Sequence, residues 1–140
     1  MKLQTALRYA NSVAARVRSV NGLLATPLSD SEAVRISRIW VFGSTVKGSK
    51  APNDLDLLIE MKAAGRRRKW RQTTTDRRYY QLYGVRRAPN CRNQALIWLT
   101  KGMRKVSRHL LDTEEVEIDV KVMIYPCNDL NKHMARMTAN

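Results

Sequence analysis

Apolar residues recur every three or four positions near the start of the chain, and this spacing predicts an amphipathic helix over residues 3–20. The same period predicts a second long helix over residues 93–111, although Gly102 weakens it. The tail over residues 128–140 is polar and predicts no more than one weak helical turn.

Three shorter apolar segments have the character of strands, at residues 36–42, 55–61 and 116–125. The third alternates strictly between apolar and charged positions, so one of its faces is acidic. Together with the helices, these strands predict an α/β fold in which a small mixed sheet has helices packed on one face. The length and the apolar content of 44% fit a single domain over residues 1–140.

The most informative pattern joins the first two strands. An apolar run ends in Gly43 and Ser44, and a nine-residue spacer leads to Asp54 and Asp56, which are separated by one leucine. Alternating side chains put both aspartates on one face of a strand, where two carboxylates repel each other unless a cation lies between them. Mg²⁺ suits such a site, because it keeps waters and takes substrate phosphates as further ligands. Gly43 lets the backbone approach a ligand, and the Ser44 hydroxyl with nearby N–H groups can hold a phosphate. The alternative is a surface turn followed by two solvated aspartates.

This pattern resembles the signature of the polymerase-β-like nucleotidyltransferase superfamily, and in particular its minimal nucleotidyltransferase branch. The resemblance covers residues 36–61 and 115–125. It implies an enzyme that moves a nucleoside monophosphate from an NTP, such as ATP, to an acceptor hydroxyl with release of pyrophosphate. The implied cofactor is Mg²⁺ or Mn²⁺. The implied catalytic and metal-binding residues are Asp54, Asp56 and Asp119, and the implied nucleotide-binding residues are Gly43, Ser44 and Lys47.

The family requires a third carboxylate on a neighbouring strand, and the acidic face of residues 116–125 supplies it. Asp119 is the predicted third ligand, and Glu117, one pleat away on the same face, is the alternative. An edge strand with a solvated charged face is the other interpretation. The connection from Asp56 to Asp119 is longer than the single helix of small family members, so the resemblance implies an insertion.

The insertion, residues 62–92, is strongly basic. It holds eleven basic residues and one acidic residue, and so carries +10 of the net charge of +14. Arginines interleaved with aromatic residues favour binding to RNA or DNA, because they pair with phosphates and stack on bases. Triphosphate capture, a solvated flexible loop and docking to an acidic protein are the alternatives. The predicted nucleic-acid-binding residues are Arg66, Arg67, Arg68, Trp70 and Arg71.

Two other functions remain open for the whole chain: an antitoxin-like enzyme that adenylylates a partner protein, and a non-catalytic nucleic-acid-binding protein with the same fold. The paired aspartates count against the second, because without a metal they would repel phosphate. A protein partner or a homo-oligomer is compatible with the sequence. No apolar run is long enough to span a membrane. We find no secretory signal and expect reduced cysteines and a cytoplasmic protein. His109 and His133 are interpreted as surface or packing residues.

Overall fold

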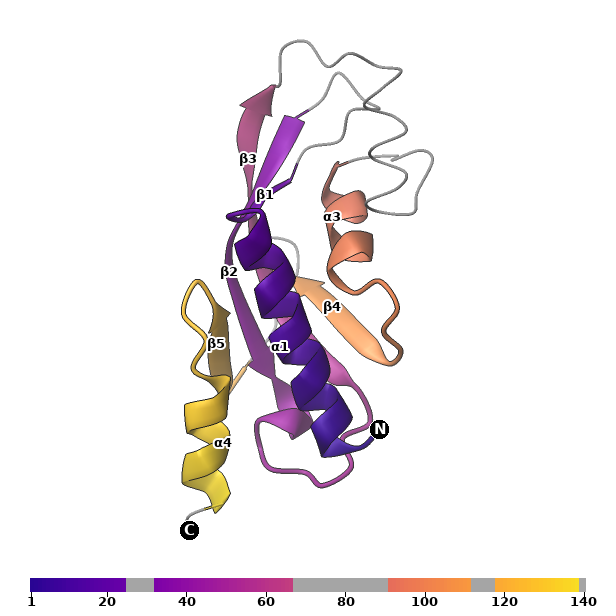
Figure 1. Ribbon diagram of the computed structural model, residues 1–140, viewed down its shortest axis with the longest axis vertical. Helices are drawn as coiled ribbons and strands as arrows, with labels where there is room; N and C mark the ends of the chain where they lie inside the picture. Colours follow the sequence, from indigo (N-terminus) through magenta and orange to yellow (C-terminus); the bar gives the residue numbers. More distant parts are fainter. Residues whose placement is uncertain (25–31, 67–90, 112–117, 139–140) are drawn as a thin grey trace.

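The computed structural model describes residues 1–24, 32–66, 91–111 and 118–138 (Figure 1). In chain order the elements are α1 (Leu3–Ser19), β1 (Leu23–Leu24), β2 (Glu32–Phe42), the 3₁₀ turn η1 (Gly43–Thr45), β3 (Leu55–Arg66), α3 (Cys91–Leu99), β4 (Val106–Leu110), β5 (Lys121–Tyr125) and α4 (Leu130–Thr138).

The strands form one mixed sheet in the order β1-β2-β3-β4, and β5 also pairs with β2. The long strands β2 and β3 are antiparallel, as are the pairs β1–β2 and β2–β5. Only β4 runs parallel to its neighbour, β3. Three α-helices accompany this sheet in the described residues, so the chain has a mixed α and β architecture.

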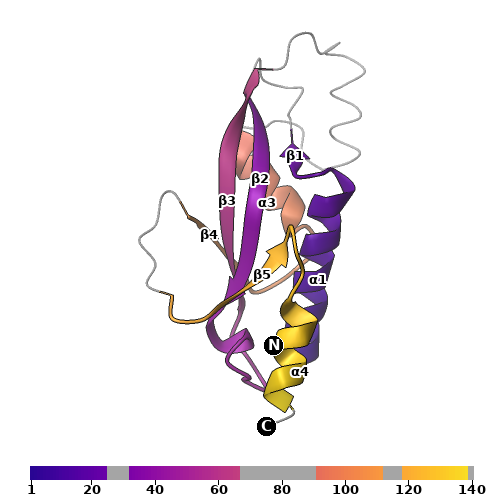
Figure 2. The same ribbon diagram turned by 90° about the vertical axis from the view of Figure 1, so that its left-hand side faces the viewer.

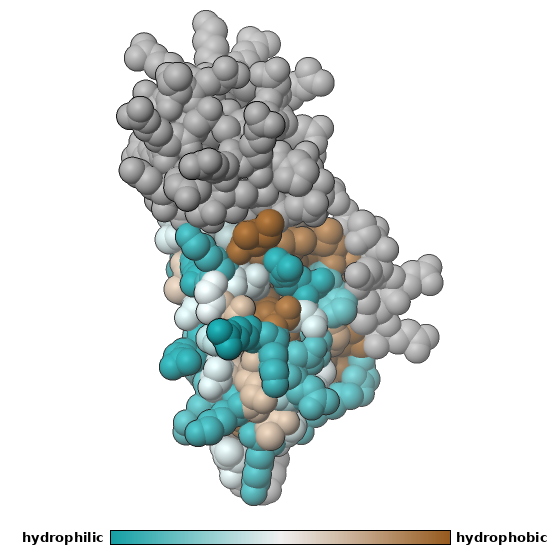
Figure 3. Space-filling model, turned by 90° about the vertical axis from the view of Figure 1, so that its right-hand side faces the viewer, coloured by the Kyte–Doolittle hydropathy of each residue, from teal (hydrophilic) through white to brown (hydrophobic). Residues whose placement is uncertain are grey.

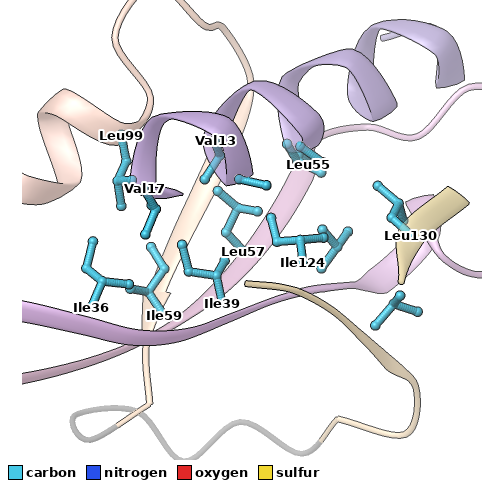
Figure 4. Packing of buried hydrophobic residues seen from close by; sticks show 14 of the residues in the cluster. Val13, Val17, Ile36, Ile39, Leu55, Leu57, Ile59, Leu99, Ile124 and Leu130 are labelled. Atoms are coloured by element: carbon cyan, nitrogen blue, oxygen red, sulfur yellow. The ribbon is translucent and has the colours of Figure 1, made fainter. Parts of the chain in front are cut away.

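The hydrophobic core lies between one face of the sheet and the helices α1 and α3 (Figure 2). On α1, Val13 and Val17 point toward Ile39 of β2 and Leu57 of β3 (Figure 4). All four side chains are fully buried. The helix α4 joins the same core through the buried Leu130. The expectation of helices packed on one face of a small mixed sheet is therefore confirmed for the described residues.

The opposite face of the sheet carries the candidate site. Trp40 pairs with Leu58 across β2 and β3, and both are buried but lie outside the core cluster. Side chains alternate along a strand, so Phe42 and Asp56, which also pair with each other, lie on this same face. We call it the acid face.

The predicted helix over residues 93–111 is confirmed in its first part and wrong in its second part. The helix α3 ends at Leu99, and the chain then turns through Gly102 and Lys105, which both have positive φ angles (82° and 57°). Residues with such angles cannot continue a right-handed helix. The following segment forms β4, where hydrogen bonds to β3 replace those of a helix.

Other boundaries also differ from those expected. The strand β2 begins at Glu32 rather than at residue 36, and β3 ends at Arg66 rather than at residue 61. The third strand starts at Lys121 rather than at residue 116, because β2, its partner strand among the described residues, ends at Phe42, which pairs with Lys121. The polar tail forms α4, a helix of nine residues, because the buried Leu130 anchors it to the core.

Most of the basic insertion lies outside the described residues, which end at Arg66 and resume at Cys91. Arg67, Arg68, Trp70 and Arg71 therefore have no described position, and Arg66 is the last residue of β3. Across the described residues, no helix has the length and apolar content that crossing a membrane requires. Hydrophilic residues dominate the described surface on the side shown in Figure 3.

Candidate metal and nucleotide site

Asp54 and Asp56 lie together at the start of β3. Asp54 immediately precedes the strand, and Asp56 is its second residue, so both carboxylates fall on the acid face. The side chain of Asp56 is only 20% exposed. Burial, and then the negative charge of Asp54, raise the pKa of Asp56 above its ordinary value, whereas His109 lowers it to a smaller extent. The structure therefore brings together the two acids that the sequence paired.

Gly43 lies directly against Asp56. The preceding residue, Phe42, is the register partner of Asp56, which places the turn after β2 beside this carboxylate. A Cβ atom at position 43 would lie 2.5 Å from Oδ2 of Asp56, and the φ angle of Gly43 is 77°. Both the space and the backbone conformation therefore require glycine. The Gly-Ser turn and the second aspartate, thirteen residues apart, are parts of one site.

The turn η1 brings the other predicted nucleotide-binding residues to the same end of the sheet. Ser44 is partly buried, and the following Thr45 is fully buried with a hydroxyl that finds no hydrogen-bond partner in the described part of the chain. Lys47 is half exposed, and its Nζ lies 3.0 Å from Oδ2 of Asp119. The turn therefore carries a cation whose present partner is an exposed carboxylate.

Asp119 does not join the other two acids in this arrangement. It lies two residues before β5 with its side chain 72% exposed. The hydrogen bond from Lys47, and then that from the Val120 N–H, hold the pKa of its carboxyl below the ordinary value. In the part of the chain that the structure describes, no three His, Cys, Asp or Glu side chains are grouped to hold a metal ion. Glu117 lies outside the described residues.

Two residues of β4, neither of them predicted, complete the surroundings of the acid pair. The Ser107 hydroxyl donates a hydrogen bond to Oδ2 of Asp54 over 2.5 Å. The ring of His109 has its Nε2 3.7 Å from Oδ1 of Asp56 and packs edge-on against Phe42. The parallel pairing of β4 with β3 aligns Ser107 with Asp56 and so brings both polar side chains to the acid face.

A signal for these two residues is present in the sequence. In the segment from Val106 to Leu110, the apolar end residues and the polar Ser107 and His109 fall at alternate positions, as in a strand, although Arg108 takes the middle position where an apolar residue would complete the pattern. The helical period of the preceding residues obscured it. The interpretation of His109 as a packing residue is incomplete, because its ring contacts both Phe42 and the carboxylate of Asp56.

The acid pair fits a divalent cation of the Mg²⁺ class. Mg²⁺ is commonly held by one or two protein carboxylates, with water and substrate phosphates as its other ligands. Asp54 and Asp56 supply two such carboxylates. Burial first, and then the charge of Asp54, raise the pKa of Asp56, and a bound cation would favour its charged form. The site thus has protein ligands for a metal ion that is also bound to the phosphates of a substrate.

Comparisons of the chain with protein-family models, with curated proteins and with solved structures found no match. The arguments below therefore depend on the residues of this chain and on their geometry.

Proposed function

We propose that this protein is a metal-dependent nucleotidyltransferase of the polymerase-β-like type, which moves a nucleoside monophosphate from an NTP to an acceptor hydroxyl and releases pyrophosphate. The contact between Gly43 and the carboxylate of Asp56 carries the proposal, because it joins the Gly-Ser turn and the acid pair in one site. A solvated turn and an unrelated pair of surface aspartates would not need such a contact.

Asp54 and Asp56 would hold Mg²⁺ or Mn²⁺ through their carboxylate oxygens. The bound ion would neutralise phosphate charge and polarise the attacking oxygen of the acceptor. Ser107 fixes the orientation of Asp54 through its hydrogen bond, which is the role that outer-shell groups have at metal sites. Phosphoryl-type transfer needs mainly positioning and charge neutralisation, and these are the properties that such a site supplies.

Gly43, Ser44 and Lys47 would hold the β- and γ-phosphates. Lys47 is half exposed, and its ion-pair partner in the described part of the chain is the exposed carboxylate of Asp119, so it can exchange that partner for phosphate oxygens. The exchange would release Asp119, the predicted third carboxylate, from its ion pair. Recruitment of Asp119 to the acid pair would then follow the binding of the NTP.

The direct test is incubation with Mg²⁺ and each α-labelled NTP in turn, with total RNA, with DNA, or with the protein alone. Label is expected on an acceptor together with release of pyrophosphate, and EDTA is expected to abolish both. The matched control is the double variant Asp54→Asn/Asp56→Asn, purified in the same way. Labelling that persists undiminished in this variant, or the absence of both labelling and Mg²⁺-dependent NTP binding in the wild type, would contradict the proposal.

A further inference from the structure

A second polar feature lies on the β5 side of β2, whereas the acid pair lies on its β3 side. A pocket of about 450 Å³ lies between β5 and α4, with Trp40 of β2 at its base. Trp40 pairs with Met123 of β5, and Phe42 pairs with Lys121, so these residues share the acid face. The residues that line the pocket are Trp40, Lys121, Val122, Met123, Asp129, Lys132, His133 and Arg136.

The lining is basic. Lys121, Lys132 and Arg136 are exposed cations, and among the described residues none of the three forms an ion pair with a carboxylate. The one acid, Asp129, already has local partners. Its carboxylate accepts a hydrogen bond from the Cys127 thiol, and its carbonyl oxygen accepts the first helical hydrogen bond of α4, from the N–H of His133. The three cations are therefore available to an anionic ligand.

Their arrangement suits a row of phosphates. Lys132 and Arg136 are four residues apart on α4, which places them on one side of the helix and about 6 Å apart along its axis. Lys121 approaches from β5, with its Nζ 4.6 Å from the centre of the Trp40 ring. Lysine and arginine side chains placed along an open groove are the usual ligands of a nucleic-acid backbone.

The pocket offers little surface for stacking or for an apolar anchor. Trp40 and Val122 are each only 7% exposed, and the Trp40 ring contacts the cationic ends of Lys121 and Arg38. The other aromatic ring of the lining, His133, is partly buried and hydrogen-bonded to the carbonyl oxygen of Val46, so it is not a free platform for a base. A protein partner usually inserts aromatic or aliphatic anchors into apolar pockets, which this surface also lacks. Phosphate groups fit the lining better than either.

The pocket is close to the acid pair. Phe42 has Asp56 as its partner on one side and Lys121 on the other. Neighbouring strands are about 4.8 Å apart, so the backbones of Asp56 and Lys121 are separated by roughly 10 Å. A nucleic-acid strand whose phosphates follow α4 and β5 would reach the acid pair within a short distance.

We propose that the β5–α4 pocket binds the phosphodiester backbone of a single-stranded nucleic acid through Lys121, Lys132 and Arg136. If the function proposed above is correct, this strand is the acceptor, and the pocket directs its end to Asp54 and Asp56. This contact is additional to any that the basic insertion makes, and it involves residues that the sequence did not single out.

The test measures binding of a fluorescent single-stranded oligonucleotide by anisotropy, with EDTA present and NTP absent, so that the result is independent of catalysis. The variant is Lys132→Ala/Arg136→Ala, which removes two pocket cations. The matched control is Lys101→Ala/Arg104→Ala, which removes one exposed lysine and one exposed arginine from the turn between α3 and β4. Figure 1 shows this turn and α4 on opposite sides of the molecule.

We expect the pocket variant to bind about tenfold or more weakly near physiological salt, and the control to lose much less. The slope of log K against log salt should become shallower by about 1.4 in the pocket variant, since each phosphate contact to a single strand contributes about 0.7. Equal losses in both variants would overturn the proposal, because they would indicate a diffuse effect of net charge. No loss in the pocket variant would also overturn it.

Two competitors distinguish which class of anionic ligand the pocket binds. If free NTP without metal displaces the oligonucleotide from the wild type but not from the pocket variant, the pocket is a triphosphate site and the proposal of a strand-binding site is wrong. If polyglutamate competes as well as unlabelled oligonucleotide at equal charge, the surface fits an acidic protein instead. Weak competition by both is the expected result. A binding-competent protein that fails to transfer nucleotides would contradict only the function proposed above.

Discussion

The two sides of β2 present opposite charges on one face of the sheet, and they are built differently. On the β3 side, Asp56 is mostly buried and in contact with Gly43, and Ser107 holds its neighbour Asp54. On the β5 side, Lys132 and Arg136 are exposed on a helix of nine residues. Packing and hydrogen bonds hold the side chains of the acidic side in place, which suits the proposed chemistry. The exposed side chains of the basic side can adjust their positions, which suits the proposed binding of a flexible nucleic-acid strand. Substitutions should therefore affect rate and folding on the first side, and affinity on the second.

The largest effect is expected from the acids. Asp56→Asn should lower nucleotidyl transfer by more than about 100-fold, because it removes a metal-binding carboxylate and not merely one of its supports. Asp119→Asn should lower it comparably if Asp119 is the third carboxylate. Initial rates at saturating NTP and Mg²⁺ measure both.

A small effect of Asp119→Asn would exclude it from the metal site and leave it as the ion-pair partner of Lys47, and Glu117→Gln would then be tested. A small effect of Asp56→Asn would contradict the assignment of the acidic side as the catalytic one. Oligonucleotide binding in EDTA should be retained in all three variants, which checks that they are folded.

Ser107→Ala should have the next largest effect on rate, about 10- to 100-fold, because Asp54 would lose the group that orients it. The control is Ser37→Ala. The Ser37 hydroxyl also donates to a carboxylate on β3, that of Glu60, but at the middle of β2, away from the acid pair. Titration of Mg²⁺ in the activity assay should show a weaker apparent affinity for Ser107→Ala alone. Equal losses in the two variants would indicate that Ser107 supports the sheet rather than the metal.

Gly43→Ala tests the contact between the two halves of the motif. The control is Gly102→Ala, because Gly102 has a similar φ angle of 82° but open space where a Cβ would lie. Gly102→Ala should cost about 1–2 kcal/mol from backbone strain alone. Gly43→Ala should cost at least about 1 kcal/mol more, from the clash with Asp56. Urea denaturation measures both, and equal costs would mean that Asp56 moves away freely.

The smallest effect is a dependence of stability on pH. The pKa of Asp56 is raised in the folded state by burial and by Asp54, so the folded protein holds this proton more tightly than the unfolded chain. Its stabilising contribution is complete below the ordinary value of about 3.9 and is lost as the pH rises through the raised value. Without metal, Asp56→Asn should therefore melt at a higher temperature than the wild type at neutral pH, and the difference should vanish in acid.

Glu60 provides the opposite case. The hydrogen bonds from Arg38 and Ser37 lower its pKa, so it stabilises the fold above its ordinary pKa and this contribution is lost as the pH falls through the lowered value. Glu60→Gln should therefore be slightly less stable than the wild type at neutral pH and equal to it in acid.

For the Asp56 prediction, the contradicting outcome is a lower melting temperature of Asp56→Asn at neutral pH, which would show that Asp56 is structural.

The parts of the fold that the sequence predicted depend on local patterns. The helix α1 and the strands β2 and β3 follow from periodicity, and the positions of Asp54 and Asp56 follow from alternation along one strand. The strand β4 does not follow from periodicity, because the apolar residues before it also fit a helix. What decides its structure is the pairing with β3, a distant segment. The start of β5 likewise depends on where β2 ends. The positions of Ser107 and His109 beside the acid pair therefore follow from the tertiary structure and not from a local sequence pattern.

The environment of Trp40 has a practical consequence. Its indole lines the β5–α4 pocket, with Lys121 and Arg38 over the ring at 4.6 and 5.4 Å. Indole emission responds to nearby charge, and a phosphate that draws Lys121 away would change it. The chain has three tryptophans, so replacing Trp70 and Trp98 by phenylalanine would leave Trp40 as the single tryptophan, which can be excited apart from the tyrosines. Such a protein would report the arrival of an anionic ligand without any attached dye.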